Sequence, residues 1–249
     1  MITYCDYQLR VKIVLSSVSD IRLVRHYNGA LQGMIYSLLN RDTATRLHEE
    51  GYVLGKRHFK LFSFSRLFGT RQVFGGYVVF VSPVLFYVTS SDEEFINELC
   101  SNALKAKNVM LEVNTLRVSE VSVLPDPEVV TRMVMNTMSP ITVYSTVYTA
   151  DGKRKTYYYS PYEPDFSHLI SENLKKKHLL ITGQEINGEV SLEPLRVREV
   201  IGMFKRTIIK GWIGKFRVCG PVELLKIGYD TGFGPKNSIG YGMVEIEPQ

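Results

Sequence analysis

The chain has 249 residues, with 30 Lys and Arg against 25 Asp and Glu, a formal net charge of +5 and 45% hydrophobic residues. This length allows one large domain or two of ordinary size, and the hydrophobic content suffices for a packed core. No apolar run is long enough for a transmembrane helix, and the polar N-terminal segment lacks the apolar stretch of a signal peptide, so we expect a cytoplasmic protein without a membrane partner. The widely spaced Cys5, Cys100 and Cys219 favour reduced thiols over a disulfide framework or a zinc site.

The first half of the chain alternates predicted strands and helices in the order β-α-β-β-α-β with additions, which is the ferredoxin-like pattern. Apolar residues between 27 and 40 recur at helical spacing, with Asn28 as the expected N-cap. The strands at 73–81 and 84–89 are expected to pair across Ser82-Pro83. The predicted elements are, in order, a strand at 9–15, a basic connection at 22–25, helices at 27–40 and 42–51, strands at 60–65, 73–81 and 84–89, a helix at 91–105 that begins with a capping box, and strands at 109–113 and 116–124.

Pro125-Asp126-Pro127 is the predicted domain boundary, because prolines stiffen a link and interrupt regular structure. We therefore expect an N-terminal domain at 1–124 and a C-terminal domain at 125–249. The predicted elements of the second half are a strand at 131–138, an extended segment at 141–148, a hairpin turn at Asp151-Gly152, a helix at 165–178 that ends in a run of lysines, β-rich basic segments at 191–209 and 212–219, a helix from Pro221 and a strand at 243–246. The expected fold class is α+β, with two tandem ferredoxin-like (RRM-like) domains whose antiparallel sheets face a central cleft.

Basic residues concentrate in two segments that lie far apart in the sequence. Residues 22–71 contain nine Lys and Arg against three Asp and Glu, and residues 196–217 contain seven against one. Two such segments can form one groove for a polyanion, or they can be two solvated faces that never meet. The candidate polyanion-binding residues from these segments are Arg25, Lys56, Arg57, Lys205, Arg206 and Lys210.

A glycine-rich segment close to the C-terminal end is the most distinctive pattern in the chain. Its two Gly-x-Gly pairs suit a loop whose backbone approaches another group closely and whose exposed amides could bind phosphate. It is neither a P-loop nor a dinucleotide fingerprint, because no Gly-Lys-Ser/Thr is present and the segment lies between a helix and a strand. A plain connection remains the alternative. The candidate phosphate-binding residues of this loop are Gly232, Gly234, Lys236, Asn237, Ser238, Gly240 and Gly242.

Tyr36, His48 and Lys60 lie in the stretch that runs from the first predicted helix to the strand that follows it, and their side chains could take part in chemistry. On the helix at 27–40, Tyr36 lies roughly 140° from Leu31 and shares its face with small or polar residues, so it should point into a cleft or solvent. On spacing alone, each of the three could equally be an ordinary surface or interface residue. No cluster of carboxylates or of His and Cys has metal-ligand spacing, so we expect no metal and no cofactor.

The pattern Gly-x-Gly-x5-Gly-x-Gly with an internal lysine resembles the glycine-rich loop of the RAMP superfamily. Within this superfamily, the chain resembles Cas family number six, which comprises the CRISPR-associated endoribonucleases that cut precursor CRISPR RNA inside its repeats. The resemblance rests further on Leu31-Gln-Gly-Met-Ile-Tyr36, Leu47-His48-Glu49, Lys60-Leu-Phe-Ser-Phe-Ser65 and Ser139-Pro140-Ile141. It implies two ferredoxin-like domains and places the family's catalytic Tyr, His and Lys at Tyr36, His48 and Lys60.

The implied reaction uses the 2′-OH beside the scissile phosphate as nucleophile and leaves a 2′,3′-cyclic phosphate and a 5′-OH, without a metal. His48 can exchange protons near neutral pH, Lys60 can stabilise the phosphorane, and Tyr36 can orient the 2′-OH or transfer a proton. Which of Tyr36 and His48 is base or acid stays open. The resemblance implies that CRISPR repeat RNA is a partner, so the polyanion-binding and phosphate-binding candidates above become the expected RNA-binding residues. Other interference-complex proteins and a second copy of the chain are further expected partners. The alternatives are a non-catalytic repeat-binding protein of the same fold and a nucleotide-binding enzyme or regulator that uses the glycine loop.

Overall fold

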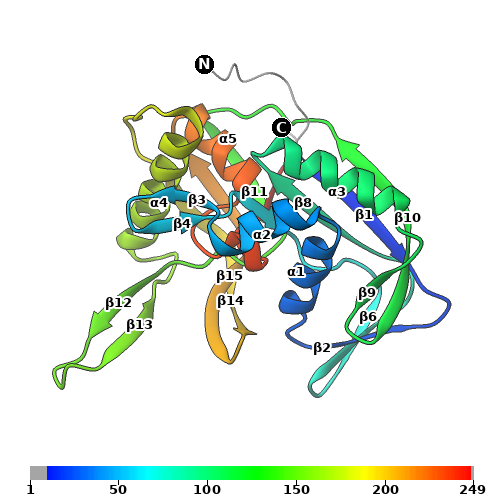
Figure 1. Cartoon of the computed structure of the whole chain (residues 1–249). Coiled ribbons are helices and arrows are strands. Elements are labelled where there is room, and N and C mark those ends of the chain that lie inside the picture. The colour runs from blue at the N-terminus through cyan, green and yellow to red at the C-terminus, as the bar shows by residue number, and fades with distance from the viewer. Residues whose placement is uncertain (1–9, 248–249) are drawn as a thin grey trace.

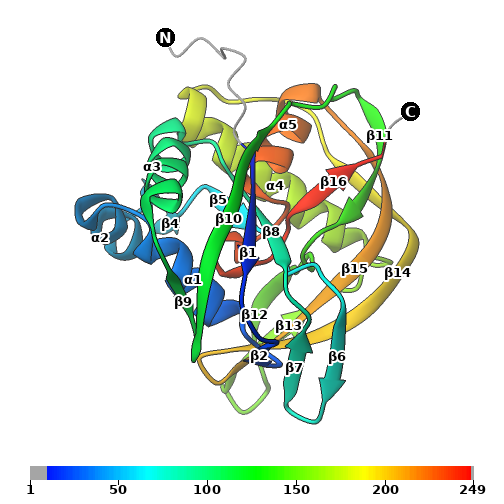
Figure 2. The same ribbon diagram turned by 90° about the vertical axis from the view of Figure 1, so that its right-hand side faces the viewer.

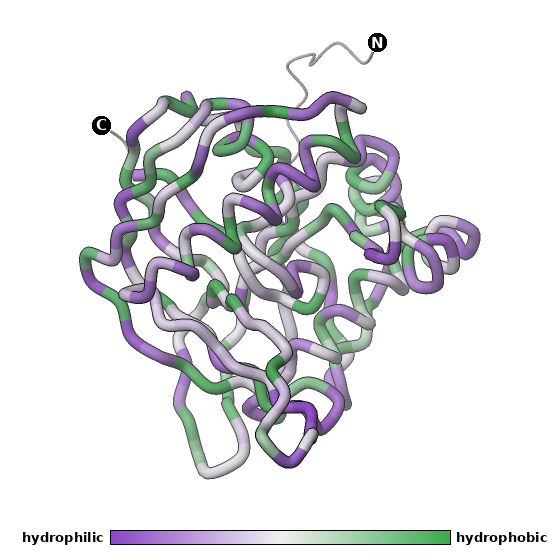
Figure 3. Tube along the Cα trace, turned by 90° about the vertical axis from the view of Figure 1, so that its left-hand side faces the viewer, coloured by the Kyte–Doolittle hydropathy of each residue, from purple (hydrophilic) through white to green (hydrophobic). Residues whose placement is uncertain are grey.

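The computed structural model describes residues 10–247, and its strands fall into two main antiparallel sheets with helices packed against them (Figure 1). The predicted strand start at Leu9 and the thiol of Cys5 lie outside the described residues. Between residues 10 and 247, no helix has the length and apolar character that crossing a bilayer requires. Hydrophobic and hydrophilic segments alternate along the whole trace in Figure 3, as expected for elements that each bury one face.

The first sheet has five strands in the order β5-β8-β1-β10-β9, and every neighbouring pair is antiparallel. These strands are β1 (Arg10–Ser16), β5 (Phe62–Phe64), β8 (Val84–Ser90), β9 (Val109–Leu111) and β10 (Asn114–Leu124). The helices of this half are α1 (Asn28–Ser37), α2 (Arg41–Glu49) and α3 (Glu93–Lys105). The N-cap of α3 is Asp92, whose carboxylate accepts a hydrogen bond from the Phe95 backbone N–H at 3.1 Å. The helix therefore begins one residue later than the predicted capping box, which started at Ser91.

Two small additions decorate the first half, and one of them corrects the predicted pairing. A three-stranded sheet contains β2 (Ile21–Val24), β6 (Arg71–Phe74) and β7 (Tyr77–Phe80) in the order β2-β7-β6. The expected single strand at 73–81 is therefore wrong, because Gly75-Gly76 turns the chain into a hairpin, and β8 pairs with β1 and β5 instead. The basic connection at 22–25 is mostly strand β2. A second hairpin joins β3 (Tyr52–Leu54) to β4 (Arg57–Phe59).

The second sheet has four antiparallel strands in the order β14-β15-β11-β16. These are β11 (Arg132–Thr137), β14 (Ser191–Phe204), β15 (Thr207–Cys219) and β16 (Val244–Ile246), with helices α4 (Pro164–Thr182) and α5 (Val222–Thr231) and a projecting hairpin of β12 (Tyr144–Tyr148) and β13 (Arg154–Tyr158). The turn predicted at Asp151-Gly152 lies in that hairpin. The predicted break between 209 and 212 is wrong: β14 and β15 turn at Lys205-Arg206, where both residues have positive φ.

Both halves have the same topology once the additions are set aside. The strands β1, β5, β8 and β10 correspond in chain order to β11, β14, β15 and β16. Across the sheets, the order β5-β8-β1-β10 of the first half matches the order β14-β15-β11-β16 of the second half. Figure 2 shows the two sheets side by side with the helices behind them. Each half has its own hydrophobic cluster, one within residues 11–116 and one within residues 133–244. The predicted α+β class with two ferredoxin-like units is confirmed.

Candidate active site

The three candidate catalytic residues come from three separate elements and lie side by side. Tyr36 is in the last turn of α1, His48 is in the last turn of α2, and Lys60 lies between β4 and β5. The rings of Tyr36 and His48 are 6.2 Å apart between centroids and stand edge to face. The Lys60 ammonium donates a hydrogen bond of 2.9 Å to the His48 backbone carbonyl. The Tyr36 and His48 rings therefore lie next to each other, whereas the Lys60 ammonium contacts the backbone of His48 and not its ring.

The environments of these side chains differ. Tyr36 is half-buried, and its ring packs edge to face against Phe62 of the core at 5.9 Å. Burial raises the pKa of Tyr36 to about 12, so the phenol is protonated at neutral pH. Burial also lowers the pKa of Lys60, whose stem is partly covered. The His48 side chain is exposed to solvent, and imidazole is the side chain that most readily exchanges protons near neutrality.

An open hollow between α1 and α2 gives access to Tyr36 and His48. It is lined by Gly29, Gln32, Gly33, Tyr36, Ala44, Thr45, His48 and Glu49. Gly29, Gln32 and Gly33 are the small and polar residues predicted to share a helix face with Tyr36, and all four line the hollow as expected. The Tyr36 ring also packs against the hydrophobic core of the first half, so the expectation that it stays away from that core is wrong. A Cβ on Gly33 would meet nothing within 4 Å, which leaves the floor of the hollow open to an approaching backbone.

The glycine-rich loop (residues 232–242) follows α5 and contains a short 3-10 helix, η1 (Asn237–Ile239). All four glycines have φ between +73° and +89°, which side chains rarely adopt. A Cβ on Gly232 or on Gly242 would come within 2.5 Å of the Asn237 amide nitrogen. A Cβ on Gly234 would meet the Thr142 carbonyl at 2.8 Å. The glycines therefore let the loop close around Asn237 and against the neighbouring chain.

The loop docks on the first half of the molecule, beside the catalytic candidates. Asn28 of α1 donates to the Ile239 carbonyl at 3.0 Å, and Gln32, one turn from Tyr36, donates to the Ser238 carbonyl at 2.7 Å. Asn28 is thus not the N-cap of α1, which is Tyr27. The prediction that the loop exposes its amide N–H groups is also wrong at three glycines, because the N–H groups of Gly232, Gly240 and Gly242 donate hydrogen bonds to backbone carbonyls.

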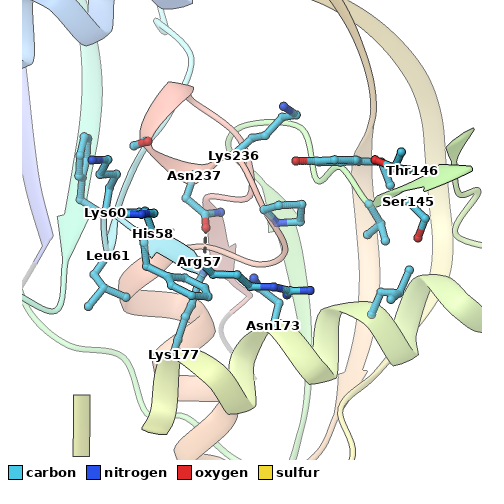
Figure 4. Close-up of a pocket in the computed structure, with 17 residues that line it drawn as sticks. Arg57, His58, Lys60, Leu61, Ser145, Thr146, Asn173, Lys177, Lys236 and Asn237 are labelled. Atoms are coloured by element: carbon cyan, nitrogen blue, oxygen red, sulfur yellow. Dashed lines mark hydrogen bonds between the residues drawn. The ribbon is translucent and has the colours of Figure 1, made fainter. Parts of the chain in front are cut away.

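A cleft lies beside the loop, between the two halves, and we call it the lysine cleft (Figure 4). Its walls are the segment 57–62, the start of β12, one face of α4 and the loop itself. The Lys236 ammonium lies 4.7 Å from the centroid of the Tyr144 ring, a cation–π contact within the cleft. The basic residues that line this cleft are Arg57, Lys60, Lys177 and Lys236.

A second cleft between the halves is lined by Arg25, Arg66, Arg71 and Arg198, and we call it the arginine cleft. Within residues 10–247 none of these four arginines forms a salt bridge. Arg66 is largely buried, and burial lowers its pKa. Unpaired guanidinium groups that converge on one cleft favour a polyanionic ligand. The two basic segments therefore do meet, and the alternative of separate solvated faces is excluded.

The remaining basic candidates lie around the clefts. Lys205 and Arg206 form the exposed tip of the β14–β15 hairpin, while Lys210 on β15 is 3.5 Å from Glu199. Lys56 is exposed in the turn of the β3–β4 hairpin, next to Arg57. Sequence reasoning singled out Arg25 but missed Arg66, Arg71 and Arg198, which stand out only when both halves are folded together. Among residues 10–247 no group of three or more His, Cys, Asp or Glu could hold a metal.

Comparisons with known proteins find relatives along almost the whole chain. Residues 124–246 match the family model described as CRISPR associated protein Cas6, C-terminal. The chain is 32% identical over 232 residues to the CRISPR-associated endoribonuclease Cas6 of Pyrococcus furiosus, covering 87% of this chain and 81% of the relative. It is 28% identical over 247 residues to the CRISPR-associated endoribonuclease Cas6 1 of Methanocaldococcus jannaschii, covering 95% and 92%. A solved structure described as CRISPR associated protein Cas6 has a TM-score of 0.81 at 26% identity, covering 96% and 99%.

Proposed function

The chain belongs to the Cas6 family of CRISPR-associated endoribonucleases. From that premise we propose that Tyr36, His48 and Lys60 are the catalytic residues with which it cuts repeat RNA. The observation that carries the proposal is the proximity of these residues: Tyr36 of α1 and His48 of α2 line one open hollow, and the Lys60 ammonium contacts the His48 backbone carbonyl beside it. The chain is an endoribonuclease that processes precursor CRISPR RNA within its repeats.

The proposed reaction is attack of the ribose 2′-OH on the adjacent phosphate. The O2′–P bond forms and the P–O5′ bond breaks, which leaves a 2′,3′-cyclic phosphate and a 5′-OH. His48 exchanges the proton that leaves the 2′-OH or the proton that the 5′-oxygen gains. Lys60 stabilises the negative charge of the phosphorane, and the protonated Tyr36 hydroxyl donates a hydrogen bond that orients the substrate. None of these steps requires a metal ion.

The proposed RNA path uses both clefts between the halves, which we take as domains divided at residue 125. Phosphates bind in the arginine cleft and at the tip of the β14–β15 hairpin, whereas the lysine cleft lies beside Lys60 and receives the RNA next to the cut. Lys236 is the loop residue proposed to contact phosphate, and the glycines, already engaged in packing, hold it in place.

Cleavage of a labelled repeat RNA in the presence of EDTA tests this function directly. We expect cleavage within the repeat, a product whose 3′ end resists phosphatase until the cyclic phosphate is opened, and a 5′ end that accepts phosphate from a kinase. A requirement for Mg²⁺ or a 5′-phosphate product would contradict the mechanism. Tight binding of repeat RNA without cleavage would favour the non-catalytic alternative, and tight binding of a mononucleotide would favour the nucleotide-binding one.

We extend the proposal to retention of the cleaved RNA and to association with other interference-complex proteins or with a second copy of the chain. These partners stay predictions. Size-exclusion chromatography with light scattering, on protein alone and after cleavage, measures both the number of copies and the bound RNA. A monomer that releases all RNA after the cut would contradict them.

A further inference from the structure

A buried lysine in the second half contacts the glycine-rich loop and has no role in the proposed reaction. Lys177 of α4 is 2% exposed. Its ammonium donates to the Asn237 side-chain oxygen at 2.7 Å (Figure 4). It also donates to the Gly232 carbonyl at 2.6 Å and lies 3.5 Å from the Thr231 carbonyl. Within residues 10–247 it forms no salt bridge. Burying a cation without a counter-ion is costly, so an apolar residue would serve the packing alone better.

The Asn237 amide is the centre of the loop, and Lys177 fixes its orientation. With its oxygen facing Lys177, the amide nitrogen donates to the Tyr241 carbonyl at 3.0 Å. The amide fits between Gly232 and Gly242, where no Cβ could be accommodated. Asn237 itself is 9% exposed. One buried ammonium thus connects the start of the loop to its middle, and the amide connects the middle to its end.

The residues on either side of Asn237 face the proposed RNA path. Lys236 has a left-handed backbone with φ of 66° and lies over Tyr144 in the lysine cleft. The Ser238 carbonyl accepts a hydrogen bond from Gln32 of α1, the helix that carries Tyr36. Because the amide of Asn237 fixes the chain between them, its orientation sets both the direction of Lys236 and the contact with α1.

We propose that Lys177 is a positioning residue for RNA binding, which acts by holding the glycine-rich loop in the shape that presents Lys236 to the RNA. Lys177 does not touch RNA in this proposal, because its donors are directed at the loop. The inference rests on the proposed function of the loop and goes beyond it by naming what keeps the loop in shape.

The test replaces Lys177 with methionine, which keeps the length of the stem and removes the donors. We expect Lys177→Met to raise KM for repeat RNA by about tenfold while kcat changes little, since Tyr36, His48 and Lys60 are untouched. The matched control is Lys176→Met, the neighbouring half-buried lysine whose ammonium lies 3.8 Å from Glu172 on the same helix. Wild-type kinetics of the control and a raised KM of Lys177→Met support the proposal.

A double-mutant cycle separates positioning from general destabilisation. If Lys177 acts through Lys236, adding Lys236→Ala to Lys177→Met should cost much less affinity than Lys236→Ala costs in the wild type. Fully additive losses, or a wild-type KM for Lys177→Met, would overturn the proposal. Should Lys177→Met melt too low to assay, Lys177→Gln at a temperature where it is folded gives the same comparison. Direct RNA binding keeps this test separate from the proposed function, because the cycle can be measured even if the wild type does not cleave.

Discussion

At the scale of single residues, burial separates the roles of Tyr36 and His48. Burial raises the pKa of Tyr36 to about 12, so little phenolate exists at neutral pH and the hydroxyl is better suited to donating a hydrogen bond than to taking a proton. His48 is exposed at the end of α2 and free to exchange protons with substrate and water. We therefore expect His48, and not Tyr36, to be the residue that exchanges a proton during the reaction.

The first prediction is that His48→Ala lowers the single-turnover cleavage rate by roughly 10²–10⁴-fold, as loss of a general acid or base does. Binding of repeat RNA should change little, because the clefts that hold the phosphates are intact. Single-turnover cleavage in EDTA and a separate binding titration measure the two effects. Equal rates for the mutant and the wild type would remove His48 from the mechanism.

The second prediction concerns stability against pH. Burial lowers the pKa of Lys177 to about 7, whereas its value in the unfolded chain is 10.5. Between these two pKa values the unfolded chain binds more protons at this site than the folded chain, so the contribution of Lys177 to stability rises with pH there. The melting temperature of the wild type minus that of Lys177→Met should therefore become more positive from pH 7 to pH 10. A difference that is constant over this range would contradict the lowered pKa of Lys177.

At the scale of elements, the glycine-rich loop combines packing with ligand contact, and the two can be separated by mutation. A Cβ added to its glycines would meet the Asn237 amide, the Thr142 carbonyl and, at Gly240, the Asn28 amide and the Phe64 ring. Its one cation, Lys236, lies instead in the lysine cleft. Substitutions at these two kinds of position should therefore have different consequences.

The third prediction is that Gly234→Val lowers the melting temperature, whereas Lys236→Ala leaves it unchanged and weakens RNA binding by about 1 kcal/mol. Valine at Gly234 would need a φ of +73° and would bring its Cβ to 2.8 Å from the Thr142 carbonyl. Melting curves and RNA titrations on both variants decide the matter. Wild-type melting and binding by Gly234→Val would make the loop a plain connection.

The fourth prediction concerns the β14–β15 hairpin. If Lys205, Arg206 and Lys210 contact phosphates, the triple alanine variant should bind repeat RNA more weakly and reduce the salt slope by roughly 0.7 per lost contact. The control is Lys107→Ala, an exposed lysine before β9 and outside both basic segments. An unchanged salt slope in the triple variant would place the groove elsewhere.

At the scale of the whole molecule, one buried arginine joins the two halves. Arg10 at the start of β1 is 1% exposed and reaches into the second half. Its guanidinium donates to the Val244 carbonyl at 2.8 Å, to the Tyr229 carbonyl at 3.0 Å and to Glu245 at 3.1 Å, and it lies 3.6 Å from the centroid of the Tyr229 ring. The clefts lie between the halves, so their shape depends on contacts of this kind.

The fifth prediction is that Arg10→Met lowers the free energy of unfolding by roughly 1–3 kcal/mol, because buried carbonyl groups lose their donor. The matched control is Lys12→Met on the same strand, whose ion pair with Glu120 is solvent-accessible and should contribute little. Urea denaturation of both variants measures the difference. Equal stability of the two variants would show that Arg10 does not hold the halves together.

Local patterns in the sequence determined the order of the strands and helices, one helix face and one turn of this protein. The helical face of Tyr36 followed from residue spacing, the turn at Asp151-Gly152 from residue type, and both β-α-β-β-α-β orders from periodicity. These features depend on residues that are neighbours in the chain, so pattern reasoning reaches them. The catalytic trio came from a resemblance to a family, since spacing alone left each residue ambiguous.

Only the tertiary structure determined the position of the β14–β15 turn, the burial of Lys177 and the arginine cleft. The turn at Lys205-Arg206 uses positive φ at two residues that carry side chains, which residue type does not predict. Lys177 belonged to a lysine run expected at a helix end, yet α4 continues to Thr182 and the packing of the loop buries Lys177. The arginine cleft brings together Arg66 of the first half and Arg198 of the second half. Burial and unpaired charge arise from contacts between distant segments, so only the folded chain determines them.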